Sequence, residues 1–217
     1  MTLRSTFAGI GKAAARKLSD GHRQLIHLTI AGADDAPIEE YSDLFQNLRT
    51  ALRQFGDSDF PVQIELRELV VLVLRANVRL VADYQWDPVE AKIRSKLLDV
   101  FGFQRRALGQ PALLSEIIAA IQNIEGVAYV DVDAFGGVPE KRAGDDRTRQ
   151  LLTLDDISAA VQEIVSEPQD KTPAAKAVSS KRVKVNVADF ENSFPRPAQL
   201  AVFTNAVPDT LILNQVK

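Results

Sequence analysis

Residues 108–133 read LGQPALLSEIIAAIQNIEGVAYVDVD, and this stretch holds a predicted helix, its stop and a predicted strand. Pro111 suits the start of a helix because its fixed φ angle and missing N–H are tolerated in the first turn. Apolar residues then recur at helical spacing and are expected to face inward, with Ile118 at the centre: Leu114, Ile117, Ile118, Ile121 and Ile124. Gly126 is expected at the C′ position, and the strand 127–133 follows directly.

The sequence before this stretch predicts a matching set of elements. An amphipathic helix with Leu44, Leu48, Leu52 and Phe55 on one face ends at Gly56, and two strands follow at 62–66 and 70–82. The second strand is a long apolar run and should be mostly buried. Asp87 and Pro88 then begin a helix whose inward stripe is Val89, Ile93, Leu97, Val100 and Phe101.

These elements give the order α-β-β-α-α-β over residues 43–134 and predict an α+β fold. In this fold, helices cover one face of a small sheet, and a β-rich C-terminal tail follows. Ahead of this core, the alanine-rich segment 7–18 favours a helix, and 24–30 is a β-prone run. After it, Thr153 and Asp156 form a capping box that predicts a short helix.

The chain is accordingly expected to divide into five segments. Residues 1–38 form an N-terminal helix and strand segment, and 39–135 form the α+β core domain. Residues 136–165 hold a polar loop, from 136 to 150, and the short helix. Residues 166–182 lack large apolar side chains and are expected to be a flexible linker. Residues 183–217 form the β-rich C-terminal segment.

Composition narrows the possible functions. Lysine and arginine number 26 and aspartate and glutamate 29, so the net charge of −3 offers no overall attraction to nucleic acid or to an anionic membrane. The chain has no cysteine, which excludes disulfides, thiolate catalysis and cysteine-bound zinc. It has neither a signal-peptide-like apolar region nor a run of 18 apolar residues, so synthesis and folding in the cytosol are expected, without membrane insertion.

One stretch resembles a dinucleotide-binding fingerprint. Gly9 to Ala14 fits G-x-G-x-x-A, and Asp34 lies twenty residues further on, where a ribose-binding acid would be wanted. The fingerprint requires a buried strand that feeds the glycine turn, and the residues before Gly9 do not read as one. A small-molecule enzyme that uses this loop is therefore kept only as the alternative function.

The histidines and aspartates are the other candidates for a site. His22 and His27 are five apart across a predicted helix-to-strand break, which does not suit a metal site. Asp131 and Asp133 share a face of the predicted strand with Val127 and Tyr129, and the opposite face is apolar. The acidic face is therefore interpreted as the solvated one.

Three further acidic pairs read as turn or first-turn residues: Asp34-Asp35, Asp145-Asp146 and Asp155-Asp156. No serine-nucleophile motif of the G-x-S-x-G type occurs. We expect no catalytic, cofactor-binding or metal-binding residues, and no enzyme activity.

Four segments in order resemble the C-terminal region of baseplate J-like proteins, which are wedge components of contractile phage tails and of phage-tail-like injection particles. They are HRQLIHLTIAGADDAPI (22–38), DFPVQIELRELVVLVLRANVRLVADYQWDP (59–88), ALGQPALLSEIIAAIQNIEGVAYVDVDAF (107–135) and PAQLAVFTNAVPDTLIL (197–213). Family members usually carry a long region ahead of this one.

The resemblance implies a structural, non-enzymatic role. Wedge proteins of this family associate with one another and with neighbouring baseplate proteins in a six-fold ring around the tail tube. The implied partners are other wedge proteins, including a paralogous J-like subunit, and baseplate proteins near the sheath and tube. The implied location is the bacterial cytoplasm during synthesis and the baseplate of the particle afterwards. A stand-alone protein–protein adaptor domain is the remaining alternative.

Overall fold

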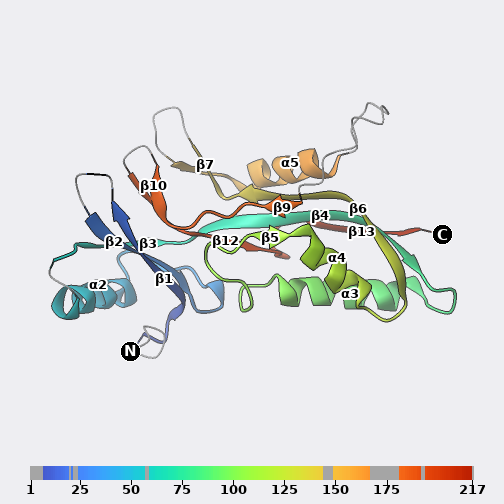
Figure 1. Ribbon diagram of the computed structural model, residues 1–217, viewed down its shortest axis with the longest axis horizontal. Coiled ribbons are helices and arrows are strands. Elements are labelled where there is room, and N and C mark those ends of the chain that lie inside the picture. Colours follow the sequence, from blue (N-terminus) through green and yellow to red (C-terminus); the bar gives the residue numbers. More distant parts are fainter. Residues whose placement is uncertain are drawn as a thin grey trace. The chain divides into compact units, whose positions relative to one another are not determined.

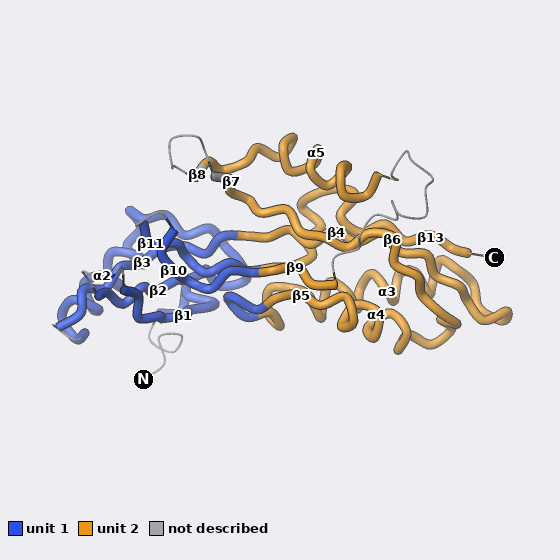
Figure 2. The backbone as a smooth tube through the Cα atoms, turned by 45° about the horizontal axis from the view of Figure 1, so that its top comes forward, with its two compact units in different colours: residues 1–68, 107–110, 185–200 blue, residues 69–106, 111–184, 201–217 orange. Residues whose placement is uncertain are grey.

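The computed structural model describes residues 7–19, 21, 24–56, 59–143, 149–166, 181–191 and 194–216. Its mixture of helices and small sheets confirms the α+β class (Figure 1). The chain divides into two compact units, which Figure 2 shows in different colours. Unit 1 comprises residues 1–68, 107–110 and 185–200, and unit 2 comprises 69–106, 111–184 and 201–217. The five segments expected from the sequence remain a prediction.

Unit 1 contains a three-stranded sheet with the order β1-β2-β3. Strand β1 (Ile10–Ser19) pairs antiparallel with β2 (Gln24–Gly32), which pairs in parallel with β3 (Val62–Leu66). Helix α2 (Asp43–Phe55) covers one face, where Phe45 and Leu48 join Ile10, Leu28 and Ile30 in a buried core. The helix η1 (Ala33–Asp35) follows β2, and β10 (Asp189–Glu191) pairs with β11 (Phe194–Arg196) in a separate hairpin.

The predicted helix at 7–18 is wrong, because the structure has strand β1 there. Alanine favours a helix only weakly, by less than about 1 kcal/mol per residue over most others, so tertiary pairing readily overrides it. Here β1 pairs with β2 along its whole length, from Ile10 opposite Gly32 to Ser19 opposite Gln24. The helix of residues 43–55 is confirmed, although Phe55 is 80% exposed and not part of its buried face.

Unit 2 is built on strand β4 (Glu68–Leu80), which is the centre of a four-stranded sheet. Its neighbours are β6 (Val127–Pro139), which is antiparallel, β13 (Leu211–Val216), which is parallel, and β12 (Gln199–Val202). Helices α3 (Trp86–Val100) and α4 (Leu114–Gln122) lie on one side of this sheet, and α5 (Leu154–Val165) lies on the other (Figure 1).

Helices therefore cover both faces of this sheet, which corrects the expectation that they cover one. The reason lies in β4, whose alternate side chains point to opposite faces. Val71 and Val73 pack in a cluster with Val161 and Val165 of α5. Leu72 and Leu74 are fully buried and point to the face that carries α3 and α4. The long apolar run that predicts β4 therefore needs cover on both sides.

The predicted order α-β-β-α-α-β is confirmed, with the two-residue strand β5 (Ala112–Leu113) added between its second and third helices, but its first two strands do not share a sheet. Strand β3 pairs with β2, whereas β4 pairs with β6, β12 and β13. In α4, Ile117 and Ile121 are fully buried, while Ile118 is only partly buried, at the side of the inward face. The helix ends at Gln122, so Gly126, with φ of +95°, shapes the turn into β6 and is not the C′ residue.

Several shorter elements complete the chain. The expected polar loop at 136–150 instead contains the end of β6 and a hairpin of β7 (Lys141–Ala143) with β8 (Arg149–Leu151). Strand β5 (Ala112–Leu113) pairs with β9 (Arg182–Val183), which is shorter than the β run expected at 183–187. Most of the expected linker, residues 167–180, lies outside the described residues.

Candidate functional site

The stretch from Gly9 to Ala14 does not open a helix, because most of it lies in β1. Packing explains both of its glycines. A Cβ atom at Gly11 would lie 2.4 Å from the carbonyl oxygen of Gly32, and one at Gly9 would lie 2.5 Å from a methyl group of Leu44. In a dinucleotide site, the backbone amides at a helix N-terminus surround the pyrophosphate. Residues 9–14 do not lead into a helix, so they supply no such N-terminus.

Asp34 and Asp35 occupy a tight turn after β2, both with positive φ, at 52° and 62°. Asp35 accepts two hydrogen bonds from Arg67, from Nε at 2.9 Å and from Nη2 at 2.7 Å. This two-point pairing of a guanidinium with a carboxylate is among the stronger side-chain interactions, and it fixes the turn to the residue after β3. Asp35 therefore serves the fold of unit 1.

The structure describes one of the two histidines. His22 lies outside the described residues, and His27 is fully buried on β2. Its Nδ1 lies 3.4 Å from Oγ1 of Thr29, and its Nε2 lies 3.4 Å from Oε2 of Glu65. One carboxylate and one hydroxyl around a buried imidazole make a polar contact within the sheet, not a metal centre.

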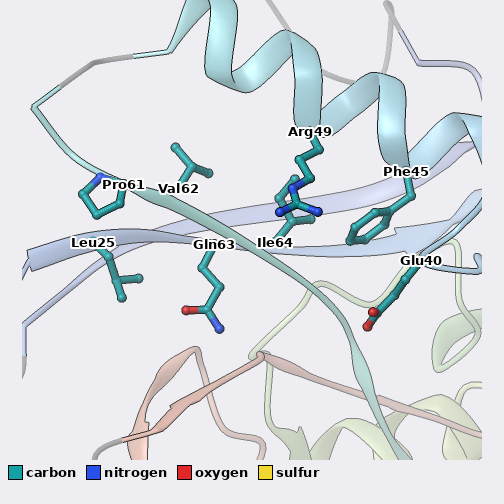
Figure 3. Close-up of a pocket in the computed structure, with 8 residues that line it drawn as sticks. All are labelled: Leu25, Glu40, Phe45, Arg49, Pro61, Val62, Gln63 and Ile64. Carbon is teal, nitrogen blue, oxygen red and sulfur yellow. The ribbon is translucent and has the colours of Figure 1, made fainter.

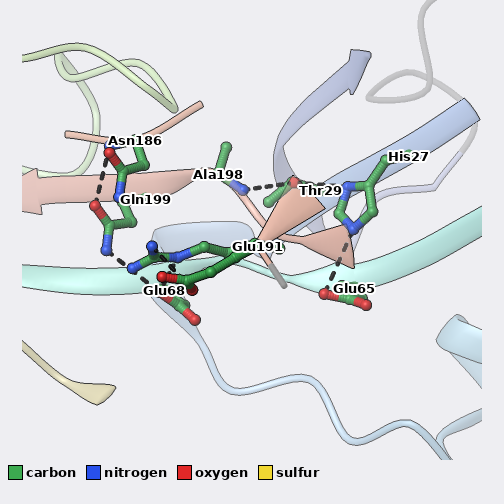
Figure 4. Close-up of polar contacts among 9 residues, drawn as sticks. His27, Thr29, Glu65, Glu68, Asn186, Glu191, Ala198 and Gln199 are labelled. Carbon is green, nitrogen blue, oxygen red and sulfur yellow. Dashed lines mark hydrogen bonds and ion pairs between the residues drawn. The ribbon is translucent and has the colours of Figure 1, made fainter. Parts of the chain in front are cut away.

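A buried polar cluster lies beside this histidine (Figure 4). Oγ1 of Thr29 accepts a hydrogen bond from the backbone N–H of Ala198 at 2.9 Å. Oε2 of Glu68, which is 1% exposed, accepts one from Nε2 of Gln199 at 3.3 Å, and Nε of Arg196 lies 3.8 Å from the same oxygen. Through these contacts the Glu68 carboxylate holds residues 196–199 against the sheet of unit 1. Because solvent cannot reach this carboxylate, a substrate cannot reach it either.

This cluster could not be predicted from the sequence, since its members are far apart along the chain. Thr29 and Ala198 are 169 residues apart, and Glu68 and Gln199 are 131 apart. The signal that could have indicated it is a glutamate at the start of the long apolar strand β4. A charged residue at such a position needs a buried partner.

Asp131 and Asp133 have different surroundings in β6. Asp131 is exposed, opposite Asn77 of β4. The register with β4 shifts at Asp133, whose Oδ2 accepts a hydrogen bond from Nδ2 of Asn77 at 2.8 Å and lies 3.4 Å from Nε of Arg75. Asp133 thus pairs with the charge of Arg75 beside a β-bulge. Asp131 and Asp133 therefore do not form a common site.

The remaining acidic pairs do not add a cluster. Asp155 and Asp156 lie in the first turn of α5, where Asp156 forms the predicted capping box with Thr153: the backbone N–H of Asp156 donates to Oγ1 of Thr153 at 3.2 Å. Asp145 and Asp146 lie outside the described residues. Across the described ranges, no group of three or more histidine, cysteine, aspartate or glutamate side chains could hold a metal ion.

The candidate site that remains is a hollow at the edge of unit 1. It has a volume of about 410 Å³ and follows β3 (Figure 3). Phe45 and Arg49 reach it from α2 on one side of the strand, and Leu25 and Gln63 line it on the other. A second hollow adjoins it, lined by Arg49 and Arg53 and by the start of β3. Apolar surface with two cations suits the binding of a protein segment better than catalysis.

The sequence was compared with known proteins. Residues 2–65 match the family model described as "Baseplate J-like central domain". Among solved structures, the chain is similar to one in the "Cryo-EM structure of the anti-feeding prophage (AFP) baseplate, 6-fold symmetrised", at 13% identity and a TM-score of 0.35. That similarity covers 64% of this chain and 34% of the other, so this chain spans about a third of its length. No curated protein matches the sequence. The resemblance to baseplate J-like proteins is thereby confirmed for residues 2–65, which match the central domain of that family and not the C-terminal region that the sequence indicated. The resemblance of the segments after residue 65 remains a prediction.

Proposed function

We propose that this chain is a structural wedge protein in the baseplate of a contractile phage tail or of a phage-tail-like injection particle. The observation that carries the proposal is the match of residues 2–65 to the baseplate J-like family. Helix α2 and the β1-β2-β3 sheet, apart from Leu66 at the end of β3, lie in that segment, together with all the residues that line the edge hollow. The part of the chain that resembles a baseplate domain therefore also carries the candidate site.

In this role the chain links neighbouring baseplate subunits around the tail tube, in a six-fold ring and without enzymatic activity. Large apolar side chains on the surface support a protein-binding role. In unit 1, Tyr41 is 92% exposed and Phe194 is 63% exposed; in unit 2, Leu151 is 67% exposed. Side chains of this kind form the anchors of protein–protein interfaces. The partners we propose are a paralogous wedge subunit and baseplate proteins near the sheath and tube.

In the described part of the chain, none of the helices is both long and apolar enough to cross a membrane. We propose that the chain is made in the bacterial cytoplasm and joins the baseplate there by contacts with other proteins.

The proposal is tested by following a tagged copy of the chain during particle assembly. Particles from the native host are separated on a density gradient, and each fraction is analysed by mass spectrometry after chemical cross-linking. We expect the tagged chain in the particle fractions, cross-linked to other baseplate proteins.

A host without the genes of the particle is the matched control, and there the chain should stay in the light fractions. If the chain stays in the light fractions although complete particles form, it is not a baseplate component. That result would favour the stand-alone adaptor domain.

A further inference from the structure

Strand β3 is an open edge of the unit 1 sheet. Among the described residues it pairs with β2 alone, and the order β1-β2-β3 leaves its other side without a neighbouring strand. All five of its residues are partly exposed. An exposed edge is a ready template for a further strand, and native proteins usually block such edges.

The hydrogen bonds to β2 show which groups of β3 face outward. The carbonyl of Pro61 accepts from the N–H of Ile26 at 2.9 Å, and the N–H of Arg67 donates to the carbonyl of Ile30 at 2.8 Å. Backbone groups alternate in direction along a strand, so residues 61, 63, 65 and 67 point to β2. The N–H and C=O groups of Val62, Ile64 and Leu66 therefore point away from the sheet.

The hollow of Figure 3 lies along these outward groups. It is lined from both faces of the sheet, by Phe45 and Arg49 above β3 and by Leu25 and Gln63 below it. A strand placed beside β3 would thus have surface for its side chains on each face, while its backbone bonds to Val62, Ile64 and Leu66. This is the geometry in which a peptide adds to a sheet edge.

The charges along the hollow select the chemistry of the occupant. Arg49 lines both hollows, and Arg53 lines the one by Phe60 and Pro61. Lys17 adds a third cation near this end, with Nζ at 4.1 Å from the centre of the Phe60 ring. Glu40 lines the first hollow. A carboxylate is therefore favoured at the Phe60 end, opposite the arginines.

A second copy of this chain fits the edge less well than an acidic segment. Antiparallel pairing of two β3 strands would bring α2 of both copies to the same face of the joined sheet. The Arg49 side chains would then face one another, and like charges at an interface are unfavourable.

We propose that the outer edge of β3 binds an extended segment of a neighbouring baseplate protein, which adds to the sheet as a fourth strand. The segment carries apolar residues at alternate positions and a carboxylate that meets Arg49 and Arg53. Backbone hydrogen bonds supply the register, and the carboxylate supplies the selectivity. The identity of the partner as a baseplate protein rests on the proposed function, whereas the binding of an acidic strand does not.

The test uses the whole chain and a fluorescein-labelled nonapeptide. Valine and aspartate alternate on one face of this peptide and threonine fills the other; a second peptide has lysine in place of aspartate. Fluorescence anisotropy should show saturable binding of the aspartate peptide, and binding of the lysine peptide should be at least about tenfold weaker. Equal affinity for both peptides, or no binding of either, would overturn the proposal.

Variants separate the two contributions. Arg49→Glu should reverse the preference between the peptides, while Arg16→Glu, an equal charge change on the exposed face of β1, should leave it unchanged. Ile64→Pro removes an outward N–H and leaves the bonds to β2 in place, so it should abolish binding of the aspartate peptide with the chain still folded by circular dichroism. An unchanged preference in Arg49→Glu would exclude the charge selection whether or not Ile64→Pro folds.

Analytical ultracentrifugation covers the other occupant. A dimer that Ile64→Pro converts to a monomer would assign the edge to a second copy and refute the acidic partner. Because these measurements use the isolated chain, their failure differs from failure of the proposed function, which would appear as absence from the particle.

Discussion

Nη1 of Arg106 lies 3.3 Å from Oε2 of Glu116, and the same carboxylate oxygen accepts the backbone N–H of Leu113 at 3.2 Å. Arg106 is only 4% exposed; its guanidinium lies 5.2 Å from the centre of the Phe101 ring, and its Nη2 donates to the carbonyl of Pro111. Burial lowers the pKa of Arg106 from its ordinary value, and Glu116 opposes that shift. One glutamate thus caps α4 and compensates a buried cation.

Glu116→Ala should therefore lower the free energy of unfolding by about 1–3 kcal/mol, because it removes a helix cap and leaves a buried charge less compensated. Glu116 is partly exposed, at 38%, so solvent reduces the charge contribution. Chemical denaturation measures the change. The control is Glu163→Ala on the exposed face of α5, which should change stability by less than about 0.5 kcal/mol. Similar costs for both variants would show that the Arg106 contact contributes nothing.

The inward face of α4 can be tested with two neighbouring isoleucines. Ile117 is fully buried, so Ile117→Ala should cost about 2–5 kcal/mol through lost burial and a residual cavity. Ile118 is partly exposed, and Ile118→Ala should cost clearly less because solvent can fill the space. Urea denaturation of both variants gives the comparison. An equal or larger cost at Ile118 would mean that the helix is rotated from the position in the structure.

Much of unit 2 could be predicted because its signals are local. The stripe of α3 from Val89 to Leu97 and the capping box of Thr153 and Asp156 depend on residues one or two helical turns apart. The face of α4 was less well determined, since isoleucines at 117 and 118 both fit an apolar stripe. Only the packing around the helix decides which one is buried.

Unit 1 was harder to predict because strand pairing defines it, and pairing is not visible in the composition of one segment. The segment Ile10–Ser19 has the composition of a helix, and only its partner β2 makes it a strand. The assignment of β3 and β4 to different sheets depends on β2, which precedes β3, and on β6, β12 and β13, which follow β4. The cluster around Glu68 depends on Gln199, which lies 131 residues further along the chain. The edge hollow was missed for the same reason, because an open edge is defined by which strands pair.

The turn before β6 depends on a residue without a side chain. Gly126 has φ of +95°, and a Cβ atom there would lie 2.5 Å from Cδ1 of Tyr84. Gly126→Ala should lower the free energy of unfolding by about 1–3 kcal/mol through backbone strain and displacement of that ring. Gly21 is the matched control, with φ of +89° and no atom within 4 Å of the added Cβ. If both alanine variants cost the same, the contact with Tyr84 has no effect.

The same tyrosine gives a dependence on alkaline pH. The hydroxyl of Tyr84 donates to Oε1 of Glu125 at 2.9 Å, and this bond raises the pKa of Tyr84 above its ordinary value. A raised pKa in the folded state means that the native chain holds the proton more tightly. Its stabilising effect is present below the unfolded pKa of about 10 and is lost as the pH rises through the folded pKa. Glu125→Gln should lower the pKa of Tyr84, as followed by ultraviolet absorbance in a background with Tyr41→Phe and Tyr129→Phe. An unchanged titration in Glu125→Gln would contradict the bond.

The two aspartates of β6 should respond differently to the same change. Asp133 faces Arg75 and Asn77, so Asp133→Ala removes a partner from each and should cost about 1–2 kcal/mol. Asp131 is exposed, and Asp131→Ala should stay within about 0.5 kcal/mol. Calcium, magnesium and manganese should leave the melting temperature of the wild type unchanged, because an ion that binds only the native state must raise it. A saturable rise in the melting temperature that either substitution abolishes would make the pair a metal site. Equal costs at the two positions would instead show that the contact of Asp133 with Arg75 does not stabilise the bulge.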